Sequence, residues 1–140
     1  MAERNRAETE AAVARANTAF YQAFTEGSYD AMADLWARSA PVACAHPGSP
    51  VITGRDAVLE SWRAILREPP PAAMRCDRVL VQLLGDAAVV TCYEGNGDRP
   101  AHLAATNVFV LEGASWRMVH HHAGPLSRAI PKPSPPSTLN

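Results

Sequence analysis

Three consecutive histidines, His120, His121 and His122, stand in the stretch WRMVHHHAGP near the end of the chain. Imidazole titrates near neutral pH, and it can act as a general base, a proton donor or a metal ligand. Successive side chains of a strand face opposite sides of a sheet, so His121 faces one side and its two neighbours face the other. The chemistry open to each ring therefore depends on which side is the inside.

His120 and His122 stand at positions i and i+2, where two strand residues can share a metal ion with a third ligand. Trp116 and Met118 belong to the same face, which favours an apolar interface edged by imidazoles. We therefore expect no metal site and no cofactor.

The composition is typical of one globular domain in a reducing compartment. The chain has 140 residues, of which 47% are hydrophobic, and its net charge of −1 argues against binding to nucleic acid or to anionic membranes. The three cysteines, Cys44, Cys76 and Cys92, have no C-x-x-C spacing and are interpreted as buried apolar fillers. The polar start MAERNRAETEAAV is unlike a signal peptide, and no apolar run approaches the ~18 residues of a membrane span. We expect a soluble, cytoplasmic protein.

Helical spacing of apolar residues predicts a first helix over residues 8–26. Tyr21 lies off the main stripe of this helix, which favours an exposed side chain over a hydroxyl in a pocket. Ser28 is expected to cap a short second helix, and Thr53 to cap a third that ends at the prolines of 69–71.

From Met74 to about Ala123 the pattern alternates, as it does in strands. Turn signals at 85–86, 96–97 and 113–114 divide this region into a meander of four strands, and a short strand precedes the third helix. Helices followed by an antiparallel sheet predict an α+β fold.

The first hairpin of this sheet brings carboxylates to an apolar face. If Gly85-Asp86 is a two-residue loop, Leu84 pairs with Ala87, and the apolar face ends in Asp77 opposite Glu94. Two acids held close together and partly desolvated raise the pKa of at least one of them, which suits proton transfer. The alternative is that the sheet emerges into solvent at this point and leaves both acids hydrated.

The third strand places one amide, Asn107, among apolar residues of the inner face. A buried amide must be hydrogen-bonded, either to a ligand or neighbouring side chain or simply to tie down a loop. The register of the last strand stays open. A three-residue connection after Leu111 places Val119 and His121 beside Asn107 and Ala105, whereas a four-residue connection turns Trp116, Met118, His120 and His122 inward.

The order of these segments resembles a known family. The "HPG" after the short strand, the helix "TGRDAVLESW", then "GDAAVVTCYE", "ATNVFV" and "WRMVHHHAGP" look like the SnoaL-like group of the nuclear transport factor 2-like superfamily, over residues 8–125. Its relatives include ketosteroid isomerase, polyketide cyclases, scytalone dehydratase, limonene epoxide hydrolase and the association domain of calmodulin-dependent kinase. The resemblance implies a cone-shaped α+β barrel, with N-terminal helices packed on a curved antiparallel sheet that encloses a pocket. It also implies homodimers built on the convex face.

The resemblance implies site residues as well. Ligand-contacting positions of the kinase association domain match Glu94, Asn107 and Ala123, and the "EHWD" motif of the cyclases matches the region of His120 to Ala123. Both comparisons put His121 on the pocket side, which favours the three-residue connection. The acid of the cyclases falls on Ala123, so their usual chemistry is not supported, and neither the oxyanion hole of the isomerase nor the Asp-Arg-Asp set of the epoxide hydrolase has a match.

The sequence thus predicts a single domain over residues 1–126, followed by a Pro- and Ser-rich, disordered tail over 127–140. The predicted catalytic pair is Glu94 and His121, and the predicted ligand contacts are Asn107, His46 at the pocket rim and Trp62 as a wall; His46 could instead bond only a nearby carbonyl, and Trp62 could only pack the third helix on the sheet. The expected function is a cofactor-independent isomerase, dehydratase or cyclase that acts on a polyketide-, terpene- or steroid-like substrate. The alternative is a non-catalytic module that binds a small hydrophobic or carboxylate ligand or forms homo-oligomers. The substrate and pathway are not encoded in any motif we find.

Overall fold

The computed structural model describes residues 2–68 and 72–133, and it confirms the predicted α+β fold. The elements run in the order α1 (Ala2–Glu26), α2 (Tyr29–Leu35), β1 (Ala43–Ala45), β2 (Ile52–Thr53), α3 (Arg55–Leu66), β3 (Met74–Leu84), β4 (Ala87–Asn96), β5 (Leu103–Glu112) and β6 (Ser115–Pro125). The strands form one sheet in the order β2-β1-β6-β5-β4-β3, in which β1 and β6 are parallel and the other neighbours antiparallel.

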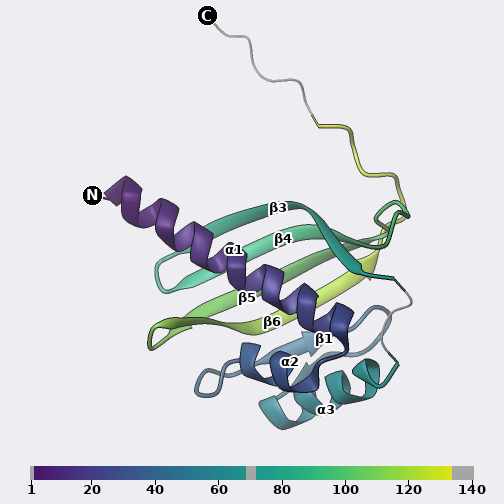
Figure 1. Cartoon of the computed structure of the whole chain (residues 1–140), viewed down its shortest axis with the longest axis horizontal. Coiled ribbons are helices and arrows are strands. Elements are labelled where there is room, and N and C mark those ends of the chain that lie inside the picture. The colour runs from purple at the N-terminus through teal and green to yellow at the C-terminus, as the bar shows by residue number, and fades with distance from the viewer. Residues whose placement is uncertain (1, 69–71, 134–140) are drawn as a thin grey trace, which may run out of the picture.

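The helices cover one face of the curved sheet. Figure 1 shows α1 crossing the concave face diagonally, with α2 and α3 packed together beside β1. The core lies in this layer and includes the large buried side chains of Phe20, Trp36, Trp62 and Phe109. In the part of the chain that the structure describes, no helix covers the convex face, and none is long and apolar enough to cross a membrane.

One predicted helix start is confirmed and one is wrong. Ser28 caps α2, and its Oγ accepts a hydrogen bond of 3.2 Å from the backbone N–H of Ala31. Thr53 does not cap α3, because it pairs with Ala43 in a short β1–β2 hairpin that the sequence analysis missed. Gly54 therefore takes the N-cap position, with φ at 90° and no side-chain cap bond. The prolines of 69–71 lie outside the described residues.

The first hairpin has the predicted turn, with Leu84 paired to Ala87, but its register changes further along. A bulge between Asp77 and Leu80 inserts one extra residue into β3, where Arg78 adopts a φ of 52°. Because the side-chain period of a strand is two, such an irregularity reverses which residues face inward.

The prediction that Asp77 faces Glu94 on the inner side is therefore wrong. Cys76 pairs with Glu94, and Asp77 pairs with Tyr93 on the convex side. The Asp77 carboxylate accepts hydrogen bonds of 2.9 and 3.0 Å from Nε of Arg75, which shares its face. Glu94 is thus the acid that the hairpin carries into the interior.

A second bulge, at Val119, resolves the register of β6. Leu111 pairs with Trp116 and Phe109 with Met118, which is the four-residue connection. After Val119 the parity reverses, so that His121 faces inward as the three-residue connection predicted, opposite Asn107 rather than Ala105. The four-residue connection therefore holds before the bulge. Beyond it, the inward facing that the three-residue connection predicted for His121 holds, but the pairing that it predicted does not.

The bulge also places the other two histidines on the convex face. His120 is half-buried and His122 exposed, with ring centroids 6.4 Å apart. After β6, residues 126–133 contain no helix or strand, while 134–140 lie outside the described part. The single domain over 1–126 and the disordered tail over 127–140 stay predictions.

Candidate functional site

Three predicted site residues meet beneath α1 on the concave face of the sheet. Glu94 comes from β4, Asn107 from β5 and His121 from β6, and their exposed fractions are 2%, 0% and 2%. Asn107 and His121 are direct cross-strand partners. The alternation of β4 and β5 turns Glu94 and Asn107 inward, and the bulge at Val119 does the same for His121.

Hydrogen bonds join these residues to α1. The Tyr21 hydroxyl donates a bond of 2.6 Å to Oε2 of Glu94 and accepts one of 3.2 Å from Nδ2 of Asn107. The same Asn107 nitrogen donates to Oδ1 of Asn17 at 2.8 Å. Both N–H groups of the Asn107 amide are therefore used, and its orientation is fixed from the helix side.

The orientation of Asn107 determines the tautomer of His121. Nδ1 of His121 lies 2.5 Å from Oδ1 of Asn107, which can only accept, so Nδ1 carries the proton. Nε2 is then left with a free lone pair, 4.0 Å from Oε2 of Glu94. A neutral base and a carboxyl group thus face each other inside an apolar core.

Burial controls the ionisation of this cluster. It raises the pKa of Glu94, against the lowering effect of the hydrogen bond from Tyr21. Burial, followed by the nearby His46, His120 and His122, lowers the pKa of His121 to about 3. The imidazole is therefore neutral near pH 7, and its contact with Glu94 is not an ion pair.

With this geometry established, the chain can be compared with known proteins. The family model described as the SnoaL-like domain matches residues 13–127. The chain belongs to the SnoaL-like family.

Solved structures and one curated protein are similar to this SnoaL-like domain. A candidate dehydratase of the NTF2-like family from Streptomyces avermitilis is 33% identical, with a TM-score of 0.76 over 88% of this chain and 99% of that one. A candidate calcium/calmodulin-dependent protein kinase type II association domain from Thiobacillus denitrificans is 38% identical, with a TM-score of 0.68 over 80% and 93%. The F-box protein SKIP8 of Arabidopsis thaliana is 30% identical over 82% of this chain, which spans 50% of that protein's length.

Helix α1 contributes to this cluster two side chains, Asn17 and Tyr21, that were not among the predicted site residues. Tyr21 is 3% exposed and Asn17 is 1% exposed, so the prediction of an exposed Tyr21 is wrong. The helix lies flat across the sheet and buries a face wider than one stripe. The i, i+4 spacing of Asn17 and Tyr21, with Val13 and Phe20 beside them, is the signal that could have found them.

His46 and Trp62 belong to an aromatic layer beside His121. The Trp62 ring is fully buried, and its centroid lies 5.8 Å from that of His121 and 4.9 Å from that of His46. Nε2 of His46 lies 2.9 Å from Oγ of Ser61, whose own proton goes to the carbonyl of Val58 at 2.6 Å, so His46 donates. Neither residue bonds to the Glu94 cluster, and their roles as rim and wall stay predictions.

A cavity of about 350 Å³ lies between α1 and β3 and reaches the edge of the cluster. Its lining includes Tyr21 and Cys76, with Thr18, Gln22 and Met74 around them. Glu94 and His121 do not line it. Tyr21, which donates a hydrogen bond to Glu94, and Cys76, the cross-strand partner of Glu94, therefore connect this cavity with the buried acid.

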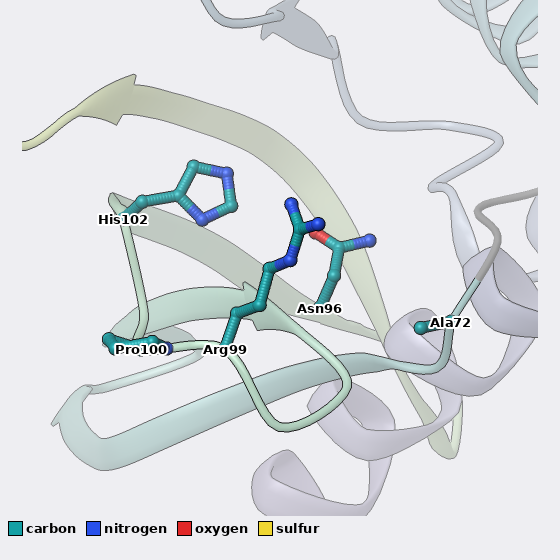
Figure 2. A pocket seen from close by; sticks show the side chains of 5 residues that line it. All are labelled: Ala72, Asn96, Arg99, Pro100 and His102. Atoms are coloured by element: carbon teal, nitrogen blue, oxygen red, sulfur yellow. The ribbon is translucent and has the colours of Figure 1, made fainter.

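A larger cavity of about 600 Å³ lies where β4 and β5 meet the start of β3. Figure 2 shows Asn96, Arg99 and His102 around it, with Pro100 on the connecting loop and Ala72 on the opposite side. None of the predicted site residues lines this cavity.

No group of three or more His, Cys, Asp or Glu side chains within 2–68 and 72–133 is arranged to hold a metal ion. The chemistry that the described side chains offer at the buried cluster is that of a carboxyl group, a phenol and a neutral imidazole.

Proposed function

We propose that this SnoaL-like domain binds a small, largely apolar ligand and carries out acid-base chemistry on it, of the dehydratase, isomerase or cyclase type. The observation that carries the proposal is the Tyr21–Glu94 hydrogen bond of 2.6 Å beside the free Nε2 of His121, within an apolar interior. Perturbed titratable groups that converge in a desolvated site are typical of acid-base catalysis.

The roles follow from the state of each group. A dehydration needs a base that removes a proton from carbon and an acid that protonates the departing hydroxyl. Glu94 suits the first role, because burial raises its pKa and so makes its carboxylate a stronger base, and the proton that it gains can pass to the departing hydroxyl. His121 is neutral, with Nε2 4.0 Å from Oε2 of Glu94, and would orient that carboxyl group. The candidate dehydratase at 33% identity supports this reaction class over the other two.

The cavities indicate the class of ligand. The cavity between α1 and β3 brings a ligand to Tyr21, which is one hydrogen bond from Glu94. The larger cavity presents Arg99 and His102, whose nitrogen donors suit a carboxylate. We therefore favour ligands that combine an apolar body with a carboxylate or a carbonyl group, and we expect side chains over the cluster to move when such a ligand binds.

A second candidate function is a non-catalytic module for ligand binding or assembly. The 38% identity to a candidate association domain favours it, as does the burial of Glu94 and His121 in this structure. The convex face also exposes apolar side chains, among them Leu80 at 55% and Leu84 at 63%. We propose a homodimer formed through this face under either function.

Proton exchange distinguishes the two functions. The full chain would be incubated in D₂O with steroids, terpenoids, aromatic polyketides and small hydroxy- and ketocarboxylates, and deuterium incorporation followed by mass spectrometry. We expect incorporation at carbon with at least one class, and a decrease of about 10²–10⁴-fold in Glu94→Gln. Glu60→Gln, on the exposed side of α3, is the matched control and should exchange like the wild type.

Thermal shifts with the same compounds complete the test. A compound that stabilises the wild type but never exchanges faster than it does in buffer would support the binding module. Equal exchange rates in wild type and Glu94→Gln would show that Glu94 takes no part in the proton transfer.

A further inference from the structure

Two thiols lie beside the Tyr21–Glu94 pair and have no role in the proposed acid-base chemistry. Cys76 is the cross-strand partner of Glu94 in the β3–β4 ladder. Cys92 stands two residues before Glu94 on the same face of β4 and is 4% exposed. The bulge that turns Asp77 outward is what places Cys76 on this inner face.

The surroundings of the two sulfur atoms are polar and specific. The Tyr21 hydroxyl lies 3.3 Å from Sγ of Cys92, and Nδ2 of Asn17 donates to Sγ of Cys76 at 3.8 Å. The register places Cys92 diagonally across the ladder from Cys76, two residues from its direct partner Glu94 and on the same inner face. Inert filler cysteines would instead sit among apolar side chains.

The two thiols differ in their access to solvent. Cys76 is half-buried and lines the cavity of about 350 Å³ between α1 and β3, whereas Cys92 is 4% exposed and does not line that cavity. A small reagent that enters this cavity therefore meets Cys76 first. Cys92 is placed to react with whatever forms on Cys76.

The two thiols also differ in the direction of their pKa shifts. The Cys92 thiol lowers the pKa of Cys76, in opposition to burial and to the charges of Asp77 and Glu94. The pKa of Cys92 is raised, first by its interaction with Cys76 and then by burial. Because the thiolate is the nucleophile, Cys76 is the better attacking group of the pair.

We propose that Cys76 and Cys92 form a peroxide-sensitive thiol pair, in which Cys76 is oxidised first and Cys92 closes a disulfide between β3 and β4. The Cys76 thiolate attacks one oxygen of hydrogen peroxide, the O–O bond breaks, and hydroxide leaves as Cys76 becomes a sulfenic acid. The Cys92 sulfur then attacks the sulfenic sulfur, and the S–O bond breaks. The net reaction consumes two thiols and one peroxide and yields one disulfide and two waters.

Oxidation of Cys76 and Cys92 would also alter the site formed by Tyr21, Glu94 and His121. Closing the disulfide removes the thiol hydrogen of Cys92 and shifts a sulfur that contacts the Tyr21 hydroxyl. This consequence rests on the proposed function, whereas the thiol chemistry itself does not. We expect oxidised protein to exchange protons more slowly with any compound that the reduced protein turns over.

Cys44 provides an internal control in β1. It is fully buried, and burial raises the pKa of its thiol to about 12. It lines neither of the two cavities near the cluster, and its sulfur lies near the His46 ring, 3.7 Å from Nε2. It should remain reduced under conditions that oxidise the other two.

The test treats the native full chain with hydrogen peroxide, blocks free thiols with N-ethylmaleimide and maps peptides by mass spectrometry. Trypsin cleavage at Arg78 separates Cys76 from Cys92, so a disulfide between them links two peptides. We expect that linked species, with Cys44 carrying maleimide after unfolding. A disulfide to Cys44, or oxidation of Cys44 as fast as that of Cys76, would overturn the proposal.

Variants then test the order of events. In Cys92→Ser, dimedone should trap a sulfenic acid on Cys76, and in Cys76→Ser, Cys92 should stay unmodified. Thermal unfolding checks that both variants fold. If either does not, maleimide labelling of the native wild type decides alone: Cys76 should react at least about tenfold faster than Cys44, in line with its exposure. Equal labelling rates, or dimedone on Cys92 first, would refute the assignment regardless of any enzymatic activity.

Discussion

The hydroxyl of Tyr21 lies 2.6 Å from Oε2 of Glu94, and this bond ties α1 to β4 through the centre of the molecule. It links the position of a helix to the ionisation of a buried carboxyl group. A shift of α1 along the sheet would change both the opening of the cavity that Tyr21 lines and the proton affinity of Glu94. The opening of this cavity and the acidity of Glu94 are therefore coupled through one hydroxyl group.

Tyr21→Phe should raise the pKa of Glu94 further, because it deletes the hydrogen bond that opposes the effect of burial. It should also destabilise the fold by about 1–3 kcal/mol, since buried groups of Glu94 and Asn107 lose a partner. Carboxyl ¹³C shifts in a pH titration and urea unfolding would measure the two effects. Tyr29→Phe, outside the cluster and stacked beneath Arg63, is the control. An unchanged or lower pKa of Glu94 would show that Tyr21 is not its donor.

Acid should destabilise the protein through His121. Its pKa is about 3 in the folded state, whereas an unfolded histidine titrates near 6.5. Between these two pH values only the unfolded state binds the proton. The contribution of His121 to the free energy of unfolding is therefore unaffected above pH ~6.5, and it falls with decreasing pH by up to about 1.4 kcal/mol per pH unit.

His121→Asn keeps a donor near the position of Nδ1 and removes the titrating ring. Its unfolding free energy, measured by urea denaturation from pH 7 to 5, should depend on pH less steeply than that of the wild type. His122→Asn, at an exposed position, is the control for the substitution and should match the wild type at pH 7. A slope unchanged in His121→Asn would mean that the ring is protonated in the folded state.

Glu112 should prove important for the loop before β1. Its carboxylate accepts hydrogen bonds of 2.8–3.0 Å from the backbone N–H groups of Arg38, Ser39 and Ala40. These bonds and the nearby Arg117 lower the pKa of Glu112 to about 2. The contribution of the Glu112 carboxylate to the free energy of unfolding is therefore complete above the pKa that Glu112 has in the unfolded chain. It is lost as the pH falls toward 2.

Glu112→Gln should lower the free energy of unfolding at pH 7 by about 1–2 kcal/mol, because one carboxylate oxygen becomes a donor that faces donors. Amide hydrogen exchange at residues 38–40 should accelerate, while that of α1 should change little. Equal exchange in variant and wild type would show that the loop is held by other contacts.

The convex face offers a test of the proposed homodimer. Val89, Val108 and His120 form one row of cross-strand partners there, and all three are half-buried in the single chain. Val108→Lys places a charge in the middle of this row and should convert a dimer into a monomer in sedimentation velocity. Ala11→Lys, at an exposed position of α1, should leave the association state unchanged. If both variants sediment like the wild type, the convex face is not the interface.

Turn residues and the alternation of apolar residues predicted the first hairpin and the facing of two site residues, because both signals depend only on neighbouring positions in the chain. The Gly85-Asp86 turn set the pairing of Leu84 with Ala87, and strict alternation turned Glu94 and Asn107 inward. Both strands that carry these two residues run without a bulge of their own, so the period of two holds along them.

The errors arose where the backbone departs from its regular period. Nothing in the residue types of Arg78 or Val119 indicates an extra residue in the ladder, and each bulge reverses the parity of the strand residues beyond it. The burial of Asn17 and Tyr21 depends on how α1 is laid over the sheet. That angle is a property of the assembled layers and has no counterpart in a stretch of sequence.

The bulge at Val119 has a consequence for comparing this chain with its relatives. Met118 and His121 face the same side of the sheet although they are three positions apart. In a regular strand, residues an odd number of positions apart face opposite sides, so the bulge makes this arrangement possible. A relative with one residue fewer at this point would keep both side chains inward. An alignment without a gap at this point would match the interior histidine of such a relative with the outward-facing His120 of this chain. The number of residues between Met118 and His121 must therefore be compared before any histidine is assigned a counterpart.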